Sequence, residues 1–242
     1  MKPPPLRLLS ATLALLAAGL GSASAQQATR KVQFRTLGFA HATGATEVYL
    51  AGAKPKDGPL AVPVYTGSVS PVIEASFTTP EAVFIGKEPG SKPLARATLS
   101  KSPRQLFFFV PSKEGAGTAY DVQVFDDDTT SFKLGTIRAI NLAPVAVRYT
   151  FGQGAPVEVA AGKSVIFPQS ATKDEFNMYP VSLEYSEAEG KWIKAYSSSW
   201  KASAERREIV VSYLEAGGTT PTVKSYSDIP PWTEAPAKAP RR

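Results

Sequence analysis

The 242-residue chain contains no cysteine and a single histidine, His41. Without cysteine it can form no disulfide, no thiolate nucleophile and no cysteine-ligated zinc site. A serine–histidine–aspartate triad would have to use His41 as its base, and no G-x-S-x-G motif supplies the serine. We therefore expect no enzyme, no catalytic residue, no cofactor and no metal ion, and interpret His41 as a loop residue.

Long apolar runs are also scarce. The longest, residues 8–20, is too short to cross the roughly 30 Å hydrocarbon core of a membrane as a helix. Lys2 and Arg7 lie at its start, and Ala23-Ser24-Ala25 follows it, which completes the pattern of a secretory signal peptide. We expect residues 1–25 to be removed on export. The remaining 217 of the 242 residues would then act in the periplasm, at the cell surface or outside the cell, without spanning the membrane.

Neither sign of charge dominates the chain. It has 27 lysine and arginine residues and 21 aspartate and glutamate residues, a net charge of +6, which falls to +4 when Lys2 and Arg7 are lost. The basic residues are scattered, whereas nucleic-acid-binding domains gather them on one face. The sequence predicts no nucleic-acid partner, and at most a weak attraction to acidic envelope polymers.

The chain is rich in short runs of β-forming residues, separated by turn sequences at spacings of about 8–12 residues. The expected strands are 31–36, 47–50, 62–65, 72–77, 82–85, 94–99, 106–110, 120–125, 132–142, 145–151, 157–159, 165–167, 181–185, 192–196, 209–214 and 223–226. This pattern predicts an all-β sandwich or barrel. The apolar run 106–110 predicts a central strand buried on both faces, and only residues 202–207 favour a single helical turn.

The two halves of the chain resemble each other at an offset of 95–103 residues. The matched segments are 35–40 with 138–143, 48–49 with 148–149, 62–67 with 157–162, 83–85 with 183–185, 104–110 with 207–213 and 122–127 with 223–228. Their shared order predicts a duplication, with units of the size of an immunoglobulin-like sandwich. We therefore expect two tandem immunoglobulin-like β-sandwich domains, 26–128 and 129–228, and a Pro/Ala-rich disordered tail, 229–242.

Three adjacent carboxylates, Asp126, Asp127 and Asp128, lie at the expected junction of the two domains. Calcium prefers clustered carboxylate oxygens, so this is the place to consider a calcium site. Adjacent side chains on a strand point to opposite faces, however, and no D-x-D-x-D-G loop is present. We interpret the cluster as a solvated turn that binds no calcium.

Three aromatic residues, Trp192, Tyr196 and Trp200, are spaced by four, so one continuous strand would carry them on the same face. Such a row could bind a sugar. A hairpin turning at 187–190 would instead place Trp192 opposite Tyr185, on the core face. We expect Trp192 and Tyr196 to be in the core and Trp200 to be exposed.

Three other patterns only partly match catalytic sites. Glu184, Glu187 and Glu189 surround one hairpin and could supply a glycosidase carboxylate pair, although exposed hairpins carry such charges for solubility. Ala161-Gly162-Lys163-Ser164 matches the end of a phosphate-binding loop, but the first glycine is missing and a strand is expected to follow. Ser198-Ser199-Trp200-Lys201 fits S-x-x-K without its partner motifs S-D-N and K-T-G.

Residues 140–147 (INLAPVAV) and 159–164 (VAAGKS) resemble exported bacterial proteins with repeated β-sandwich domains. This resemblance implies a cell-envelope location and no known activity. The layout of leader, two sandwiches, no cysteine and basic balance is also similar to periplasmic pilus-assembly chaperones. Residues 105–111 (QLFFFVP) are faintly similar to the donor-strand region of those chaperones.

The leading hypothesis is a non-enzymatic exported cell-envelope or secreted protein that presents β-sandwich surfaces to a protein or polymer partner. The first alternative is a carbohydrate-binding module that uses exposed aromatic residues, with a glycan as its partner. The second is a periplasmic pilus-type chaperone, which would donate a strand edge.

Overall fold

The structure is a computed structural model that describes residues 29–42, 45–52, 60–88, 90–113, 116–188 and 190–229. The described residues form β-strands and no helix, so the all-β prediction is confirmed and the helical turn predicted at 202–207 is wrong. No helix among these residues is long and apolar enough to cross a membrane. The predicted signal peptide lies outside the described residues, as does the predicted tail after Ile229.

Sixteen strands are described, eight in each half of the chain. The first half contains β1 (Arg30–Gly38), β2 (Glu47–Leu50), β3 (Leu60–Pro63), β4 (Ile73–Phe77), β5 (Glu81–Ile85), β6 (Pro93–Thr98), β7 (Arg104–Pro111) and β8 (Tyr120–Asp126). The second half contains β9 (Thr136–Asn141), β10 (Val147–Phe151), β11 (Val157–Val159), β12 (Ser164–Pro168), β13 (Met178–Ala188), β14 (Lys191–Lys201), β15 (Arg207–Tyr213) and β16 (Thr222–Asp228). Strand positions follow the sequence predictions closely, although β13 and β14 are much longer than expected.

The strands form four small sheets in two groups, and the strand order repeats between the groups. In the first sheet pair, an inner sheet β4-β1-β7-β8 packs on an outer sheet β3-β2-β5-β6. In the second sheet pair, an inner sheet β12-β9-β15-β16 packs on an outer sheet β11-β10-β13-β14. In each inner sheet the first strand pairs in parallel with the seventh, β1 with β7 and β9 with β15.

The register of these parallel pairs also repeats. Arg35 faces Leu106 in the first inner sheet, and Arg138 faces Ile209 in the second. Both residues of the second pair lie 103 positions after those of the first, which is the offset at which the sequences of these strands match. β7 and β15 therefore occupy equivalent central places in their sheets.

Each sheet pair encloses its own apolar core. The first is built around interlocking rings, with Phe107 stacked 4.8 Å from Phe34 and in edge contact with Phe84 at 5.7 Å. The second contains Tyr149 and Phe151, whose ring centroids are 5.7 Å apart. Because the alternate side chains of each strand point inward, these cores account for one face of every sheet.

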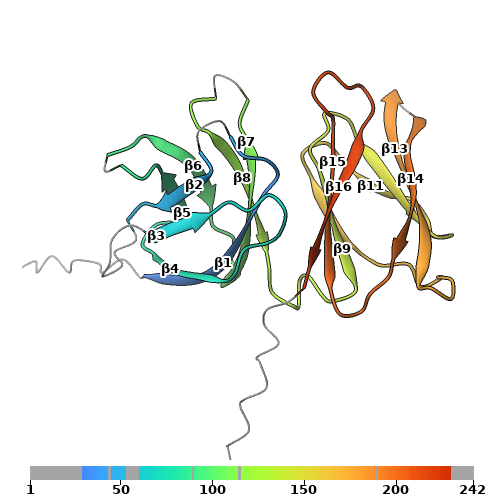
Figure 1. Cartoon of the computed structure of the whole chain (residues 1–242), viewed down its shortest axis with the longest axis horizontal. Helices are drawn as coiled ribbons and strands as arrows, with labels where there is room; N and C mark the ends of the chain where they lie inside the picture. Colours follow the sequence, from blue (N-terminus) through green and yellow to red (C-terminus); the bar gives the residue numbers. More distant parts are fainter. Residues whose placement is uncertain are drawn as a thin grey trace, which may run out of the picture.

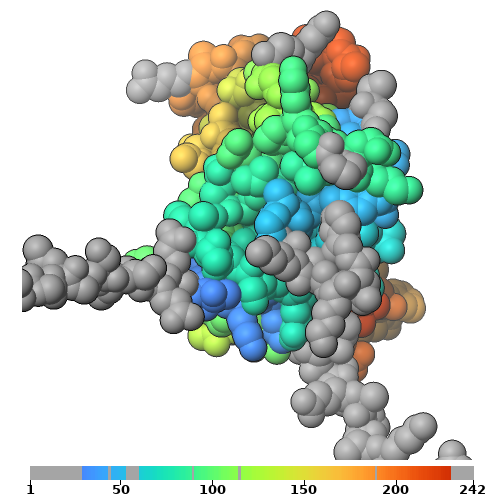
Figure 2. All heavy atoms as spheres, turned by 90° about the vertical axis from the view of Figure 1, so that its left-hand side faces the viewer, coloured from blue at the N-terminus to red at the C-terminus, as the bar shows by residue number. Residues whose placement is uncertain are grey.

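A third apolar cluster, which we call the seam, lies between the two inner sheets. Its buried members are Leu37, Leu106, Phe108, Phe132, Ile140, Ile209, Val211 and Tyr226, drawn from both halves of the chain. Figure 1 shows the two sheet pairs side by side, with β7 and β8 of the first toward β9, β15 and β16 of the second. Figure 2 views the molecule from the side of the first sheet pair, which lies in front and hides most of the second.

The seam explains why β7 is buried on both faces, as its continuous apolar sequence predicts. Phe107 and Phe109 face the core of the first sheet pair, whereas Leu106 and Phe108 face the seam. All four side chains are at most 1 % exposed. Phe108 thus packs against the second sheet pair, so burial on both faces of β7 depends on both halves of the chain.

Candidate functional site

Four charged side chains form a closed ring at one end of the seam. Arg35 on β1 donates from Nε and Nη2 to Asp127 at 2.7 and 2.8 Å, and from Nη1 and Nη2 to Asp228 at 2.7 and 2.9 Å. Arg207 on β15 donates to Asp127 Oδ1 at 2.7 Å and to Asp228 Oδ2 at 2.9 Å. Each carboxylate thus binds two guanidinium groups, and every member of the ring is at most 6 % exposed.

Two members of the ring, Arg35 and Asp228, have pKa values shifted toward their charged forms although they are buried. Burial alone would lower the pKa of Arg35, but its hydrogen bonds to Asp228 and Asp127 outweigh burial and raise that pKa. Burial alone would likewise raise the pKa of Asp228, yet Arg35 and Arg207 hold it below its ordinary value. Two positive and two negative charges cancel. Each half of the chain contributes one arginine and one aspartate and is neutral by itself, so what the two halves gain together is the pair of crossing contacts, Arg35 with Asp228 and Arg207 with Asp127.

The positional counterpart of Arg35, Arg138, lies beside the ring. Its guanidinium carbon is 4.7 Å from the ring centroid of Phe125 and 4.8 Å from that of Phe132, and Nη2 donates to the Asp126 carbonyl at 2.9 Å. Burial lowers the pKa of Arg138 to about 10. Equivalent arginines of the repeat therefore have different roles, one in the ring and one stacked on aromatic rings.

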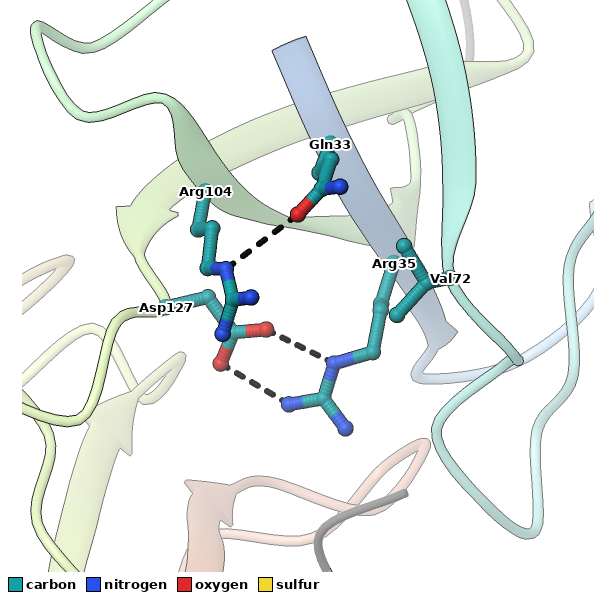
Figure 3. Close-up of a pocket in the computed structure, with 5 residues that line it drawn as sticks. All are labelled: Gln33, Arg35, Val72, Arg104 and Asp127. Atoms are coloured by element: carbon teal, nitrogen blue, oxygen red, sulfur yellow. Dashed lines mark hydrogen bonds and ion pairs between the residues drawn. The ribbon is translucent and has the colours of Figure 1, made fainter. Parts of the chain in front are cut away.

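A small cavity of about 40 Å³ borders the ring. Figure 3 shows its lining, Gln33, Arg35, Val72, Arg104 and Asp127, with the two Asp127 carboxylate oxygens bound by Nε and Nη2 of Arg35. Arg104 is exposed and donates from Nε to Gln33 Oε1 at 3.2 Å. The cavity can hold water but is far smaller than the roughly 300–1,000 Å³ of organic ligand sites, so we assign the ring a structural role.

The three adjacent carboxylates of the sequence pattern have three different surroundings. Asp126 accepts a hydrogen bond from Ser100 Oγ at 2.5 Å, and Asp127 belongs to the ring. Asp128 accepts from the Ser131 N–H at 2.8 Å, which lowers the pKa of this carboxyl. In the part of the chain that is described, no group of three His, Cys, Asp or Glu residues could hold a metal ion. The interpretation as a solvated turn is wrong for Asp127, which is 6 % exposed.

Two larger cavities lie at the same end of the second sheet pair. One, of about 490 Å³, lies beside the edge strands β11 and β12, where the two sheets separate. It is lined by Phe151, Gln153, Gly154, Ala155, Val157, Phe167, Pro168, Gln169, Ser170, Ala171 and Thr172. The other, of about 300 Å³, is lined by Gly152, Gln153, Thr172, Lys173, Asp174, Met178, Tyr179, Pro180 and Ser199. Because Gln153 and Thr172 line both cavities, we treat them together as the loop-end cleft.

The loop of residues 169–177 forms one wall of this cleft and has a fixed shape. Asp174 Oδ1 accepts hydrogen bonds from the N–H groups of Phe176 at 2.9 Å and Met178 at 2.8 Å. Asn177 adopts a φ of 61°, a left-handed conformation that asparagine tolerates better than most residues. The resulting turn leaves Phe176 69 % exposed at its tip.

The opposite wall is the turn after β10, which approaches the loop closely at Gly152. A Cβ atom on Gly152 would lie 2.6 Å from Ser170 Oγ, and its φ of 58° also favours glycine. Gln169 connects the loop to the polypeptide near the seam, because its N–H donates to the Gly135 carbonyl at 3.1 Å and its Oε1 accepts from the Ser203 N–H at 2.7 Å. The cleft is thus built on a fixed backbone.

The predicted placement of Trp192 is wrong. Trp192 pairs with Ser186, not with Tyr185, and its contact with Arg148 places it on the outer face of its sheet, away from the second core. There its ring packs on Arg148, whose guanidinium carbon is 4.5 Å from the ring centroid. Glu184 accepts a hydrogen bond from Arg148 Nε at 2.6 Å and fixes that contact.

Trp200 was expected to be exposed but packs on the second core. Its ring centroid lies 6.0 Å from that of Phe151, and its Nε1 donates to Tyr196 Oη at 3.2 Å. A register shift in the β13–β14 ladder after Leu183 separates Trp192 from the other two rings. Residues spaced by four lie on the same face of a strand only when no bulge interrupts it. The three aromatic rings therefore do not form a row.

The remaining sequence patterns have structural surroundings. His41 is exposed, and its Nε2 lies 2.7 Å from the Val64 carbonyl oxygen. Gly162, with a φ of 70°, forms a turn that leads into β12, so strand geometry follows the apparent phosphate-binding motif. The segment 198–201 lies within β14, and the donor-like segment 105–111 lies within β7, which is paired on both sides.

Two further hairpin carboxylates complete the comparison with the sequence patterns. Glu187 forms an ion pair with Lys191, while Glu189 lies outside the described residues.

The chain matches no protein-family model and no curated protein sequence.

Sequence reasoning missed the ring and the loop-end cleft. The repeat alignment already placed Asp127 opposite Asp228 and Arg104 opposite Arg207, and these paired charges were the available signal for the ring. No motif marks the cleft, which is formed mostly by neutral residues on turns and strand ends that are separate in the sequence.

Proposed function

We propose that the protein is a non-enzymatic binding protein, exported to the cell envelope or secreted, in which two tandem immunoglobulin-like sandwiches present a fixed surface to a protein or polymer partner. The observation that carries this proposal is the loop-end cleft. It has the size of a ligand site, its walls are fixed by hydrogen bonds, and its lining is mostly neutral. Such a lining suits recognition better than acid–base chemistry, which needs titratable groups of tuned pKa.

The immunoglobulin-like assignment is supported by two facing sheets in each group and by a core between them. The parallel pairing of β1 with β7 and of β9 with β15 is a variation on the antiparallel sheets of that fold. The seam and its ring favour a fixed relation between the two sandwiches, so that a partner meets one body.

Export and binding can be tested on the full chain. N-terminal sequencing of the protein recovered outside the cytoplasm should begin at Gln26. The purified protein should then bind saturably either to one envelope protein, isolated by pull-down, or to a polymer on a glycan array. A chain that stays in the cytoplasm with its first 25 residues, or that binds neither class, contradicts the proposal.

A further inference from the structure

We infer that the loop-end cleft binds a neutral glycan chain. This inference rests on the proposed function, because it names the ligand class of a protein proposed to bind rather than to catalyse. It does not use the aromatic residues that the sequence suggested for sugar binding, of which Trp192 lies on the outer face of the sheet and Trp200 packs on the core.

Charge is the first indication of the ligand class. None of the described residues that line the larger cavity carries a formal charge. In the smaller cavity Lys173 and Asp174 oppose each other in sign, and Asp174 Oδ1 is already used by the turn of the loop. A ligand with a net charge would lose its hydration in this lining without gaining a counter-charge, so the cleft favours a neutral one.

The mixture of polar and apolar groups is the second indication. Gln153 and Thr172 offer amide and hydroxyl groups that can both donate and accept hydrogen bonds. Ala155 and Pro168 line the same cavity with apolar surface. A pyranose ring combines hydroxyl groups around its edge with apolar C–H faces, and this matches the lining.

An unpaired donor supports the same conclusion. Nε2 of Gln169 is buried and has no hydrogen-bond partner, although Oε1 of the same amide accepts from Ser203. An unsatisfied buried donor costs roughly 1–3 kcal/mol, and such groups are rare in native proteins. Because Gln169 also lines the larger cavity, a ligand oxygen that reached this N–H would supply the missing acceptor.

The shape of the cleft favours a chain over a single small molecule, and its edges disfavour a peptide strand. The two cavities share Gln153 and Thr172, so a ligand can extend from one into the other. A peptide would add as a strand to β11 or β12, but β11 has three residues and begins after Pro156, while β12 ends at Pro168. Short edges limited by proline are poor templates for strand addition.

The test is a titration of the full exported chain with neutral gluco-, manno-, galacto- and xylo-oligosaccharides of increasing length, followed by calorimetry. Alginate and polygalacturonate serve as acidic comparators. We expect one neutral series to bind, with affinity that rises over the first few sugar units. Gln153→Ala and Thr172→Ala should each raise the dissociation constant at least tenfold, because both residues line both cavities.

Two variants make the result specific. Thr98→Ala, at an exposed position on β6, is the matched control for Thr172→Ala and should bind like the wild type. Trp192→Ala should also bind like the wild type, and loss of binding in that variant would move the site to the outer face of the sheet. The variants of the exposed residues Gln153, Thr172 and Thr98 should melt within about 2 °C of the wild type, since surface substitutions cost at most ~0.5 kcal/mol. Trp192→Ala also removes the contact with Arg148, so only its binding is compared.

Failure of this inference differs from failure of the proposed function. Binding of only an acidic polymer, or of a protein partner without any neutral glycan, overturns the glycan assignment and leaves the binding function in place. Binding of no ligand of any class overturns both.

Discussion

Asp127→Asn should destabilise the protein far more than its conservative chemistry suggests. The substitution keeps the size of the side chain but removes one of the two negative charges that Arg35 and Arg207 share inside the seam. Removing one partner of a buried ion pair costs about 3–5 kcal/mol, because the remaining charges stay buried without compensation. For a chain of about 150–250 residues, each kcal/mol shifts the melting temperature by roughly 2–4 °C, so we expect a loss of about 6–20 °C.

The neighbouring Asp126→Asn variant is the matched control. Asp126 is partly exposed and its carboxylate accepts one hydrogen bond, from Ser100 Oγ, so we expect a shift within about 2 °C. Thermal melting followed by circular dichroism at neutral pH compares the two directly. Equal shifts for both variants would show that the ring contributes no more than a surface carboxylate and would refute the reasoning.

Three other outcomes follow from the same structure. Phe108→Ala should cost roughly 3–5 kcal/mol by chemical denaturation, because it opens a cavity in the seam; a change below 1 kcal/mol would contradict the packing. The lowered pKa of Asp228 stabilises the folded protein above the pKa of the unfolded chain, about 4, and this stabilisation is lost as the pH falls through the lower pKa of the folded protein. In an Asp228→Asn variant, denaturation midpoints measured from pH 7 to 2 should therefore lack this decrease at low pH. Millimolar calcium should leave the melting curve unchanged, since Asp127 is committed to arginine; a rise of several degrees that Asp127→Asn abolishes would contradict this.

Most strands could be predicted because short β-forming runs and turn residues alternate regularly along the chain. The run 106–110 even predicts burial on both faces, since an apolar sequence without alternation leaves no side for water. What covers the second face could not be predicted. The apolar sequence of β7 predicts that Phe108 is buried. It does not distinguish burial inside one sheet pair from burial between two sheet pairs, because both give the same apolar sequence.

The long β13–β14 hairpin shows where periodicity fails. The four-residue spacing of Trp192, Tyr196 and Trp200 predicts a shared face only if no residue is inserted into the ladder. The structure has register shifts after Leu183 and after Ser186. Each shift changes which cross-strand partner a residue meets, and no residue type in this stretch marks the position of a bulge.

The loop-end cleft could not be predicted because its residues acquire a common role only through backbone geometry. Gln153 and Thr172 are 19 positions apart, and neither lies in a recognisable motif. Gly152 offers the best local signal, since a glycine after a strand permits a close approach and a positive φ. Even so, that signal predicts a tight turn and not the cavity beside it.

The ring is the part of the structure in which the repeat and the seam constrain each other. Asp127 and Asp228 are equivalent positions, and both enter the ring, but Arg35 and Arg207 come from different positions of the repeat. Exact symmetry would require equivalent arginines, so the two halves pack with their charges arranged asymmetrically. Each half alone would keep one arginine and one aspartate, but its share of the apolar seam would lie in water. Burial of that surface and closure of the ring therefore favour the same arrangement of the two sheet pairs.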